Sequence, residues 1–173
     1  MKKILLISGS LRTASRNTAW LRAVDAALTD SAEVMWADLN LPLFNEELEA
    51  DFPASATMLR EQVTAADAVV IATPEYNRAM TGALKNAIDW ASRPYGKNAW
   101  AGKCVMVASV SPGGIAGALA SYQVKQSLLH LGAKVSPKEM MVGHAGDKFN
   151  EAGELSDEKT KEYIAQMVEA LLA

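Results

Sequence analysis

The segment 8–17 combines short polar side chains, a glycine and a cation in a spacing that suits binding of a phosphate group. Ser10, Ser15 and Asn17 can reach an anion, and free backbone N–H groups at the start of a following helix would point the same way. The segment has neither the G-x-G-x-x-G pattern of a dinucleotide site nor the lysine of a Walker loop. A single terminal phosphate therefore fits it better than a pyrophosphate, although a polar loop with a helix cap explains the same residues. The candidates are Ser10, Leu11, Arg12, Ser15, Arg16 and Asn17.

A second polar cluster spans residues 73–82. The proline ring of Pro74 fixes the backbone angle φ at that residue. The loop could turn its backbone N–H and C=O groups toward the edge of a flat heterocycle. Tyr76 offers an amphipathic surface for stacking. The alternative is a surface turn with an exposed tyrosine. The candidates in this loop are Pro74, Glu75, Tyr76 and Asn77.

A third cluster, 109–114, ends in paired glycines. Glycines let the backbone approach a ligand ring closely and leave N–H groups free, although a plain flexible turn has the same composition. The candidates are Ser111, Gly113 and Gly114. One flat ligand with a phosphate tail would touch all three clusters if the fold brings them together.

The elements between these clusters predict that they do meet. Short apolar runs alternate with longer stretches of helical periodicity. Residues 68–72 form a continuous apolar run with a β-branched centre, as expected for a strand that is covered on both faces. Ser156 is expected to cap the last helix. The predicted strands are 4–7, 33–37, 68–72, 105–108 and 133–136, and the predicted helices are 17–28, 54–66, 82–91, 116–131 and 157–172.

This alternation predicts an α/β fold with a doubly wound, five-stranded parallel sheet and helices on both faces. The flavodoxin-like strand order 2-1-3-4-5 competes with the Rossmann order, and five strands favour the former. Ligands of such sheets bind beyond the carboxyl ends of the strands, and each polar cluster directly follows a predicted strand. The length fits one domain over residues 1–173. The loops 38–53 and 140–155 exceed the usual length and are expected to be functional or interfacial.

Composition excludes several other classes of protein. The net charge of −3 argues against a nucleic-acid partner, which usually requires a basic face. Cys104 is the only cysteine, so no internal disulfide can form, and we expect it to be a buried small hydrophobe. His130 and His144 have no flanking carboxylates at ligand spacing, so no metal site is expected. No apolar run approaches a membrane span or a signal peptide, and a cytoplasmic setting is the expectation.

Two stretches of this sequence resemble the NADPH-dependent FMN reductase family, which includes quinone-, chromate- and azo-dye-reducing members. The first is G-S-L-R-x-x-S-x-N over residues 9–17, and the second is P-E-Y-N-x-x-x-x-G-x-L-K-N-x-I-D-W over residues 74–90. The resemblance extends over nearly the whole chain. Pro112 in the glycine-rich loop departs from many members.

The resemblance implies a role for each cluster. Ser10, Arg12, Ser15 and Asn17 would hold the phosphate of FMN; Pro74, Glu75, Tyr76 and Asn77 would line the isoalloxazine, largely through backbone groups; and Ser111, Gly113 and Gly114 would close its other side. Lys85 and Asp89 could pair with each other or with Arg12. Family members form dimers or tetramers, and residues 38–45 resemble the family's interface loop, so a homodimer or homotetramer is expected.

The expected activity is oxidation of NADPH or NADH by an FMN enzyme, which passes electrons by a ping-pong cycle to a small acceptor. Quinone, free flavin, azo compound and chromate all stay open as acceptors. Because the cofactor carries the electronic work, no residue is assigned as a catalytic acid or base. Arg16, Arg78 and Arg93 are candidates for contact with the 2′-phosphate of NADPH. The alternatives are a non-enzymatic carrier of the flavodoxin type and a ligand-free regulatory domain on the same fold.

Overall fold

A computed structural model describes all 173 residues of the chain. The strands are β1 (Lys2–Ser8), β2 (Ala32–Trp36), β3 (Ala68–Thr73), β4 (Cys104–Val110), β5 (Lys134–Val135) and β6 (Met140–Val142). The α-helices are α1 (Arg16–Leu28), α2 (Ala54–Ala65), α3 (Gly82–Ala91), α4 (Ala118–His130) and α5 (Glu158–Leu172). Two short 3-10 helices, η1 (Glu46–Ala50) and η2 (Ala145–Lys148), lie in the two long loops. None of the helices is long and apolar enough to cross a bilayer.

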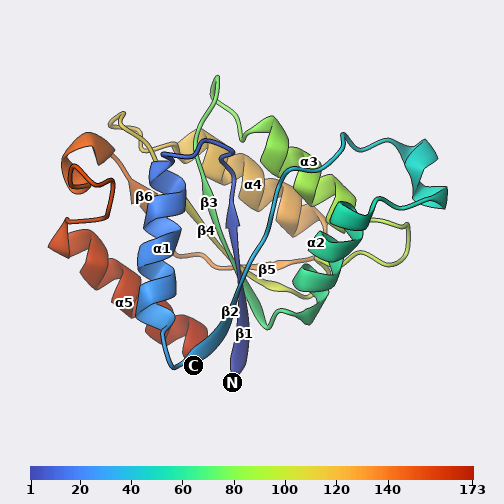
Figure 1. Cartoon of the computed structure of the whole chain (residues 1–173), viewed down its shortest axis with the longest axis horizontal. Coiled ribbons are helices and arrows are strands. Elements are labelled where there is room, and N and C mark those ends of the chain that lie inside the picture. The colour runs from blue at the N-terminus through green and yellow to red at the C-terminus, as the bar shows by residue number, and fades with distance from the viewer.

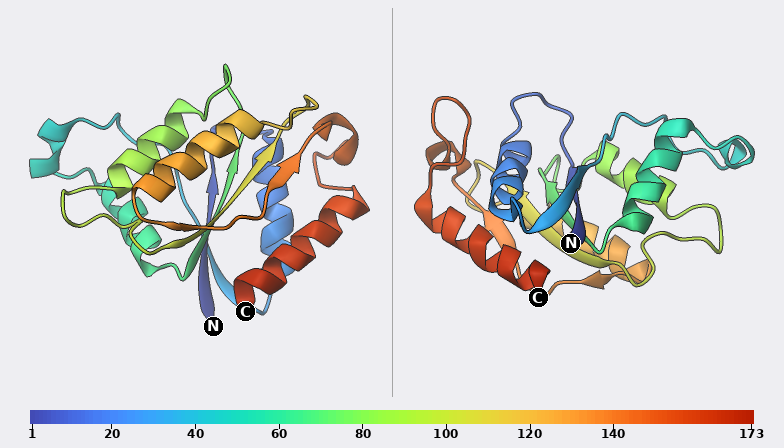
Figure 2. Two further views of the ribbon diagram at one scale, coloured as in Figure 1. Left: turned by 180° about the vertical axis from the view of Figure 1, so that it is seen from behind. Right: turned by 60° about the horizontal axis from the view of Figure 1, so that its bottom comes forward.

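The strands form one parallel sheet in the order β2-β1-β3-β4-β5, which confirms the predicted flavodoxin-like order. Helices α1 and α5 pack on one face, and α2, α3 and α4 pack on the other (Figures 1 and 2). Successive side chains of a strand point to opposite faces. Ile4 and Leu6 of β1 therefore join the core under α1 and α5, whereas Leu5 and Ile7 join the second core. This double burial explains the continuous apolar runs in the sequence.

The fifth strand is divided, which the sequence did not indicate. β5 pairs with the first two residues of β4, and β6 pairs with Ala108, Ser109 and Val110 at its end. Segment 136–139 leaves the edge of the sheet between them. The predicted strand over 133–136 corresponds to β5 only, and β6 was not predicted. Three residues carry no periodic signal, and only pairing with β4 makes 140–142 a strand.

Three local predictions were wrong. Cys104 is exposed rather than buried, because it is the first residue of β4 and burial begins at Val105. Helix α4 begins at Ala118, two residues late, since Ala116 and Gly117 have φ values of 58° and 75°, which no α-helix contains. Asp157 rather than Ser156 caps α5, and it accepts a hydrogen bond from the backbone N–H of Thr160 at 2.9 Å.

The carboxyl ends of strands β1, β3 and β4 lie together at one end of the sheet. The loops that follow these strands lie side by side there (top of Figure 1). The three polar clusters of the sequence are these loops. Both chain termini lie at the opposite edge.

Candidate functional site

The β1–α1 loop ends at a helix start whose amide groups are free. Ser15 caps α1 by accepting a hydrogen bond from the backbone N–H of Thr18 at 3.3 Å, and Ser10 Oγ accepts one from the N–H of Arg12 at 3.2 Å. The backbone N–H groups of Leu11 and of residues 13–17 have no partner in the protein. The loop therefore presents unpaired donors at the positive end of a helix.

Gly9 begins this loop for a reason that the sequence did not show. Its φ is not positive, so the backbone conformation is not what requires glycine here. A Cβ atom there would lie 3.2 Å from Cδ2 of Leu84 and 3.3 Å from both the carbonyl oxygen of Ala72 and Cδ of Pro74. Glycine thus lets the β1–α1 loop lie against α3 and the β3–α3 loop.

Asn17 is buried and joins α1 to the end of β4. Its Nδ2 donates to the carbonyl oxygen of Val110 at 3.0 Å, and its Oδ1 accepts from the N–H of Val110 at 3.1 Å. Strand β3 ends opposite Ser109, one residue earlier, so the Asn17 side chain satisfies backbone groups beyond the end of that strand pair. The side chain that the resemblance assigns to phosphate binding is therefore occupied as a structural bridge, and the backbone N–H of Asn17 is the free donor.

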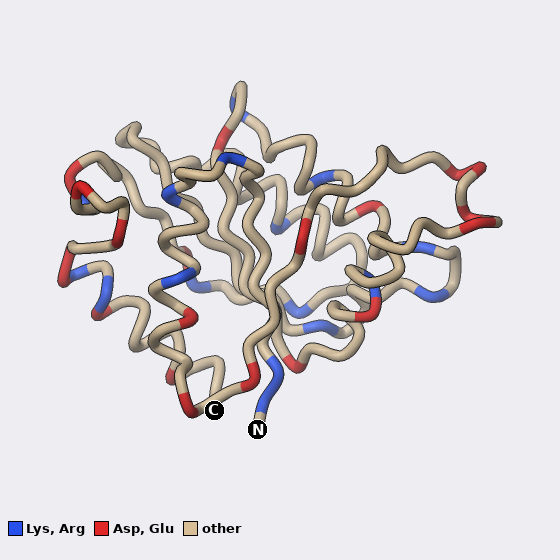
Figure 3. The backbone as a smooth tube through the Cα atoms, viewed as in Figure 1, with Lys and Arg blue, Asp and Glu red and all other residues tan.

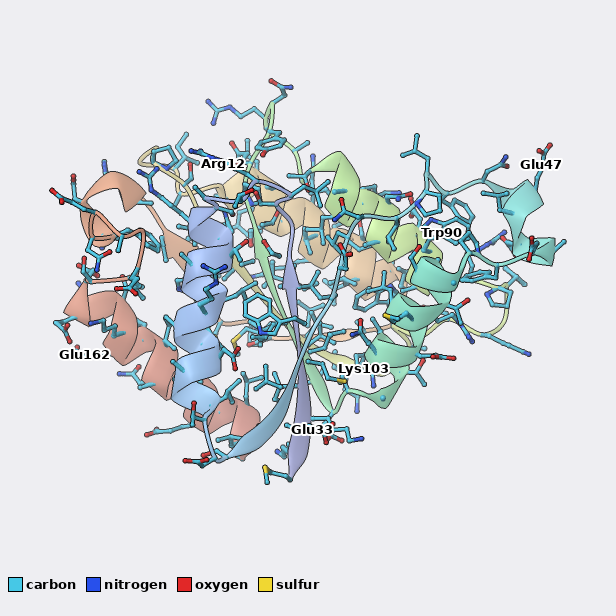
Figure 4. The ribbon with its side chains drawn as sticks, viewed as in Figure 1. Arg12, Glu33, Glu47, Trp90, Lys103 and Glu162 are labelled. Carbon is cyan, nitrogen blue, oxygen red and sulfur yellow. The ribbon has the colours of Figure 1, made fainter.

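Two arginines at this helix start have no anionic partner. Arg12 and Arg16 are exposed, and their side chains form no ion pair or hydrogen bond within the chain. Arg12 lies near the N-terminal end of α1, beside the place where the three loops meet (Figure 4). Figure 3 shows basic positions at this end of the helix. Such cations favour an anionic ligand.

The other predicted cations are already paired. Arg93 binds Glu49 and Glu46 of the 38–53 loop and stacks 5.6 Å from the ring centre of Phe44, so it is not available for a 2′-phosphate. Arg78 lies 3.5 Å from Glu75. Lys85 and Asp89 pair with each other at 2.7 Å rather than with Arg12.

The β3–α3 loop is a tight hairpin. Tyr76 and Ala79 exchange two backbone hydrogen bonds of 3.0 Å, and the residues between them, Asn77 and Arg78, have φ values of 52° and 64°. Two successive positive φ values give the turn its mirror-image form, which is uncommon without glycine. The hairpin projects from the sheet edge, leaves Tyr76 more than half exposed and leaves the N–H groups of Glu75, Asn77 and Arg78 without partners.

Glu75 uses its side chain to cap α4, which the sequence did not predict. Its Oε2 accepts hydrogen bonds from the backbone N–H groups of Leu119 at 3.1 Å and Ala120 at 3.3 Å. Gly117, the residue at the cap position of α4, has no side chain that could do so. A carboxylate from a different loop thus satisfies the first amides of this helix.

The β4–α4 loop has an open glycine and a packed one. A Cβ atom on Gly113 would meet only Ser111 Oγ, at 3.8 Å, whereas one on Gly114 would lie 3.4 Å from Nε2 of His144. Ser111 Oγ accepts from the N–H of Gly113 at 3.3 Å, and the N–H groups of Gly114 and Ile115 have no partner. The loop therefore has two backbone N–H groups that are free to bind a ligand.

Thr81 is a residue of this site that sequence reasoning missed. Its Oγ1 donates to the carbonyl oxygen of Gly9 at 2.6 Å and accepts from the N–H of Leu84 at 3.2 Å, so it caps α3 and fixes the β1–α1 loop together. A threonine directly before Gly82 is a helix-cap signal that could have indicated it. Thr81, Asn17 and Glu75 each join two elements that are distant in the sequence.

Two grooves of the surface are lined mostly by residues outside the three loops. One of about 630 Å³ is lined by α1, residues 152–155 and α5. Another of about 590 Å³ is lined by residues 114–116 of the β4–α4 loop together with residues of β6 and α5.

Comparison with known proteins assigns the chain to a family. Residues 2–147 match the family described as NADPH-dependent FMN reductase. This chain belongs to that family. Membership makes it a flavin-dependent oxidoreductase that uses a nicotinamide cofactor, as the sequence motifs predicted.

The relatives resemble this reductase over its whole length. An NAD(P)H-dependent FMN reductase of Pseudomonas aeruginosa is 41% identical over 172 residues, which cover 98% of this chain and 92% of the relative. A quinone reductase of Pseudomonas putida is 40% identical over 169 residues, which cover 96% of this chain and 90% of that protein. Among solved structures, FerB of Paracoccus denitrificans, a flavoenzyme NAD(P)H:(acceptor) oxidoreductase, aligns with a TM-score of 0.90 and 37% identity over 99% of this chain and 96% of its own.

The donors of the reductase suit the chemistry of FMN. The phosphate needs several N–H donors and cations, and the β1–α1 loop has six unpaired N–H groups and two unpaired arginines. The flavin ring needs donors and acceptors at its edge, and free backbone groups flank the site in both other loops. No carboxylate forms an ion pair with Arg12 or Arg16, so these cations are available to the phosphate. The residues present therefore fit the cofactor.

Proposed function

We propose that residues 1–173 form one FMN-binding domain that takes electrons from NADPH or NADH and passes them to a quinone-type acceptor. The observation that carries this proposal is the convergence of three loops with unpaired backbone donors at one sheet edge, next to the unpaired Arg12 and Arg16. Family membership supports the cofactor and the nicotinamide.

The phosphate of FMN would bind to the β1–α1 loop. Backbone N–H groups of residues 13–17 and of Leu11 donate to it, together with the hydroxyl groups of Ser10 and Ser15. Both hydroxyl oxygens already accept a backbone hydrogen bond, so their protons are free to point at the ligand. Arg12 and Arg16 supply the charge that balances a phosphate dianion.

The isoalloxazine would lie between the β3–α3 and β4–α4 loops. Pro74, Glu75, Tyr76 and Asn77 line one side through backbone groups, and Ser111, Gly113 and Gly114 line the other. The Glu75 carboxylate is turned to α4, so this residue contributes its backbone N–H to the ligand side.

When bound, FMN supplies a group that accepts a hydride and releases electrons, which no side chain of the protein can do. The chain contributes positioning and backbone donors that favour negative charge at the edge of the ring. We assign no residue as a general acid or base. We propose that the nicotinamide leaves the site before the acceptor enters the same place, in a ping-pong cycle.

Quinones are the acceptor class that the relatives support, since four relatives named as quinone or benzoquinone reductases are 33–40% identical to this chain. Free flavin, azo compounds and chromate are further candidates for the same site. Of the three cations considered for the 2′-phosphate of NADPH, Arg78 and Arg93 are paired within the chain, and Arg16 is assigned to the FMN phosphate, so we assign no arginine to the 2′-phosphate.

We propose that the reductase acts as a homodimer or homotetramer in the cytoplasm. Leu119, Tyr122 and Leu129 leave apolar area exposed along α4, and Leu43 of the predicted interface loop is 81% exposed. In that loop Leu39 is buried within the subunit instead. Light scattering coupled to gel filtration tests the assembly, and a monomer at micromolar concentration would contradict it.

An absorbance spectrum of the purified protein with added FMN, before and after anaerobic NADPH, tests the function. Bound flavin whose absorption bleaches within the mixing time is the expected result. Bound flavin that stays oxidised would instead favour a carrier of the flavodoxin type; a flavodoxin shares the fold at 18% identity with a TM-score of 0.62. Protein that binds no flavin would overturn the proposal.

A further inference from the structure

Two side chains join the β3–α3 loop to helix α4, one from the loop and one from the helix. From the loop to the helix, Glu75 accepts hydrogen bonds from the N–H groups of Leu119 and Ala120. From the helix to the loop, the Gln123 Oε1 accepts a hydrogen bond from the N–H of Met80 at 3.1 Å. Each side chain thus holds backbone of the other element.

Helix α4 depends on these contacts because its own start is poorly secured. Ala116 and Gly117 both have positive φ values, and neither has a side chain that can cap the helix. A Cβ atom on Gly117 would lie 3.1 Å from Cβ of Ser109 and 3.6 Å from Cβ of Glu75, so the helix start lies directly against the end of β4 and against Glu75. A capping side chain at residue 117 would have to adopt a strained positive φ and would also displace Ser109.

The same geometry fixes both ends of the hairpin. Glu75 lies just before the Tyr76–Ala79 turn and Met80 just after it. Held at both ends by one helix, the hairpin keeps its position relative to the β4–α4 loop, which leads directly into α4. The Glu75 side chain is 12% exposed and also lies near Arg78, so part of its charge is balanced within the hairpin.

We propose that Glu75 and Gln123 are positioning residues that set the distance between the two loops on either side of the flavin ring. This inference rests on the proposed function of these loops. Neither side chain would touch the ring; they act through the backbone of residues 76–80 and 111–117. Loss of either contact then lets the hairpin move away from α4 and loosens the ring while leaving the phosphate loop unchanged.

The test compares substitutions that keep or remove the acceptor oxygen. Gln123→Glu and Glu75→Gln keep an oxygen that can accept the same backbone hydrogen bonds, whereas Gln123→Leu and Glu75→Ala do not. Gln126→Leu is the matched control, since Gln126 is exposed on the same helix and makes no hydrogen bond through its side chain. The measurements are the dissociation constant of FMN, the circular dichroism of the bound flavin, the kcat and KM for NADPH, and exchange of the Met80, Leu119 and Ala120 amide protons.

We expect Gln123→Leu and Glu75→Ala to weaken FMN binding by about fivefold, the equilibrium equivalent of one helix cap of about 1 kcal/mol. Their flavin dichroism should change, kcat should fall more than KM changes, and the three amides should exchange faster. Gln123→Glu and Glu75→Gln should restore most of each property, and Gln126→Leu should match the wild type.

The inference would be overturned if Gln123→Leu kept the FMN affinity, flavin dichroism and kcat of the wild type. It would also be overturned if this variant lost stability in urea while these three properties stayed unchanged. If Glu75→Ala does not fold, the Gln123 pair still decides the matter. Failure of the proposed function is a separate result, because it would appear as absence of flavin binding by the wild-type protein.

Discussion

Replacement of Asn17 by Ala tests the bridge between α1 and the end of β4. Asn17 is 4% exposed, and its amide satisfies both the N–H and the C=O of Val110, which is itself 3% exposed. The substitution would leave two buried backbone groups without partners. Each such group costs about 1–3 kcal/mol, so the free energy of unfolding should fall by roughly 2–6 kcal/mol, toward the lower end if a water molecule enters.

A loss of this size is a large part of the stability of a domain, which is typically about 5–15 kcal/mol. Urea unfolding followed by tryptophan fluorescence measures it. With a slope of about 2 kcal/mol per molar urea, the midpoint should fall by about 1 M or more. We also expect FMN to bind more weakly, because Asn17 fixes the start of α1 and with it the free amides of the phosphate loop.

Asn98→Ala is the matched control for this prediction. Asn98 also makes two hydrogen bonds to backbone, donating to the carbonyl oxygen of Leu131 at 2.7 Å and accepting from the N–H of Trp100 at 2.9 Å. It lies before the start of β4, at the opposite edge of the sheet from Val110. The control should lose stability without losing FMN affinity. A loss of less than about 1 kcal/mol in Asn17→Ala, or equal FMN affinity in the two variants, would refute the reasoning.

Three further predictions follow from other contacts. Arg12→Ala with Ser15→Ala should weaken FMN binding by about tenfold to a hundredfold, the range of one charge-assisted hydrogen bond, as measured by calorimetric titration; retained full affinity would contradict the assignment of the phosphate loop. Gly9→Ala should lower the free energy of unfolding by about 1–3 kcal/mol, because the new Cβ would meet Leu84, Ala72 and Pro74. Gly82→Ala should be neutral or slightly stabilising, since no atom lies within 4 Å of its new Cβ. Comparison of the thermal midpoints of the two variants tests this contrast. Hydrogen bonds from Thr160 and then from Lys148 lower the pKa of Asp157 from 3.8 to about 2, so the stabilisation is present above about pH 4 and is lost as the pH falls through the folded pKa. Asp157→Asn should therefore be less stable than the wild type at pH 7 and nearly equal to it near pH 2, and a difference that persists at pH 2 in urea titrations would contradict this origin.

The sequence by itself determined the fold class and the order of the elements. The alternation of apolar runs with helical periodicity predicted a parallel sheet covered on both faces, because Ile4–Ile7 and Ala68–Ala72 have no polar side to expose to water. The positions of the polar clusters then followed, since strands that run in parallel place their carboxyl ends at one edge. The motifs at 9–17 and 74–90 indicated the family that the comparisons established.

Only the tertiary structure decided what individual side chains of the site do. Asn17 and Glu75 were read as ligand residues, yet their side chains satisfy backbone groups at Val110 and at the start of α4, which are distant in sequence. Arg93 was a candidate for a phosphate contact until the 38–53 loop placed Glu46 and Glu49 beside it. A buried N–H or C=O must find a partner wherever the fold leaves it, and the identity of that partner depends on which chain segments meet in space. Local sequence does not contain that information. The sequence therefore predicted where the three loops lie but not the side-chain contacts that fix their positions.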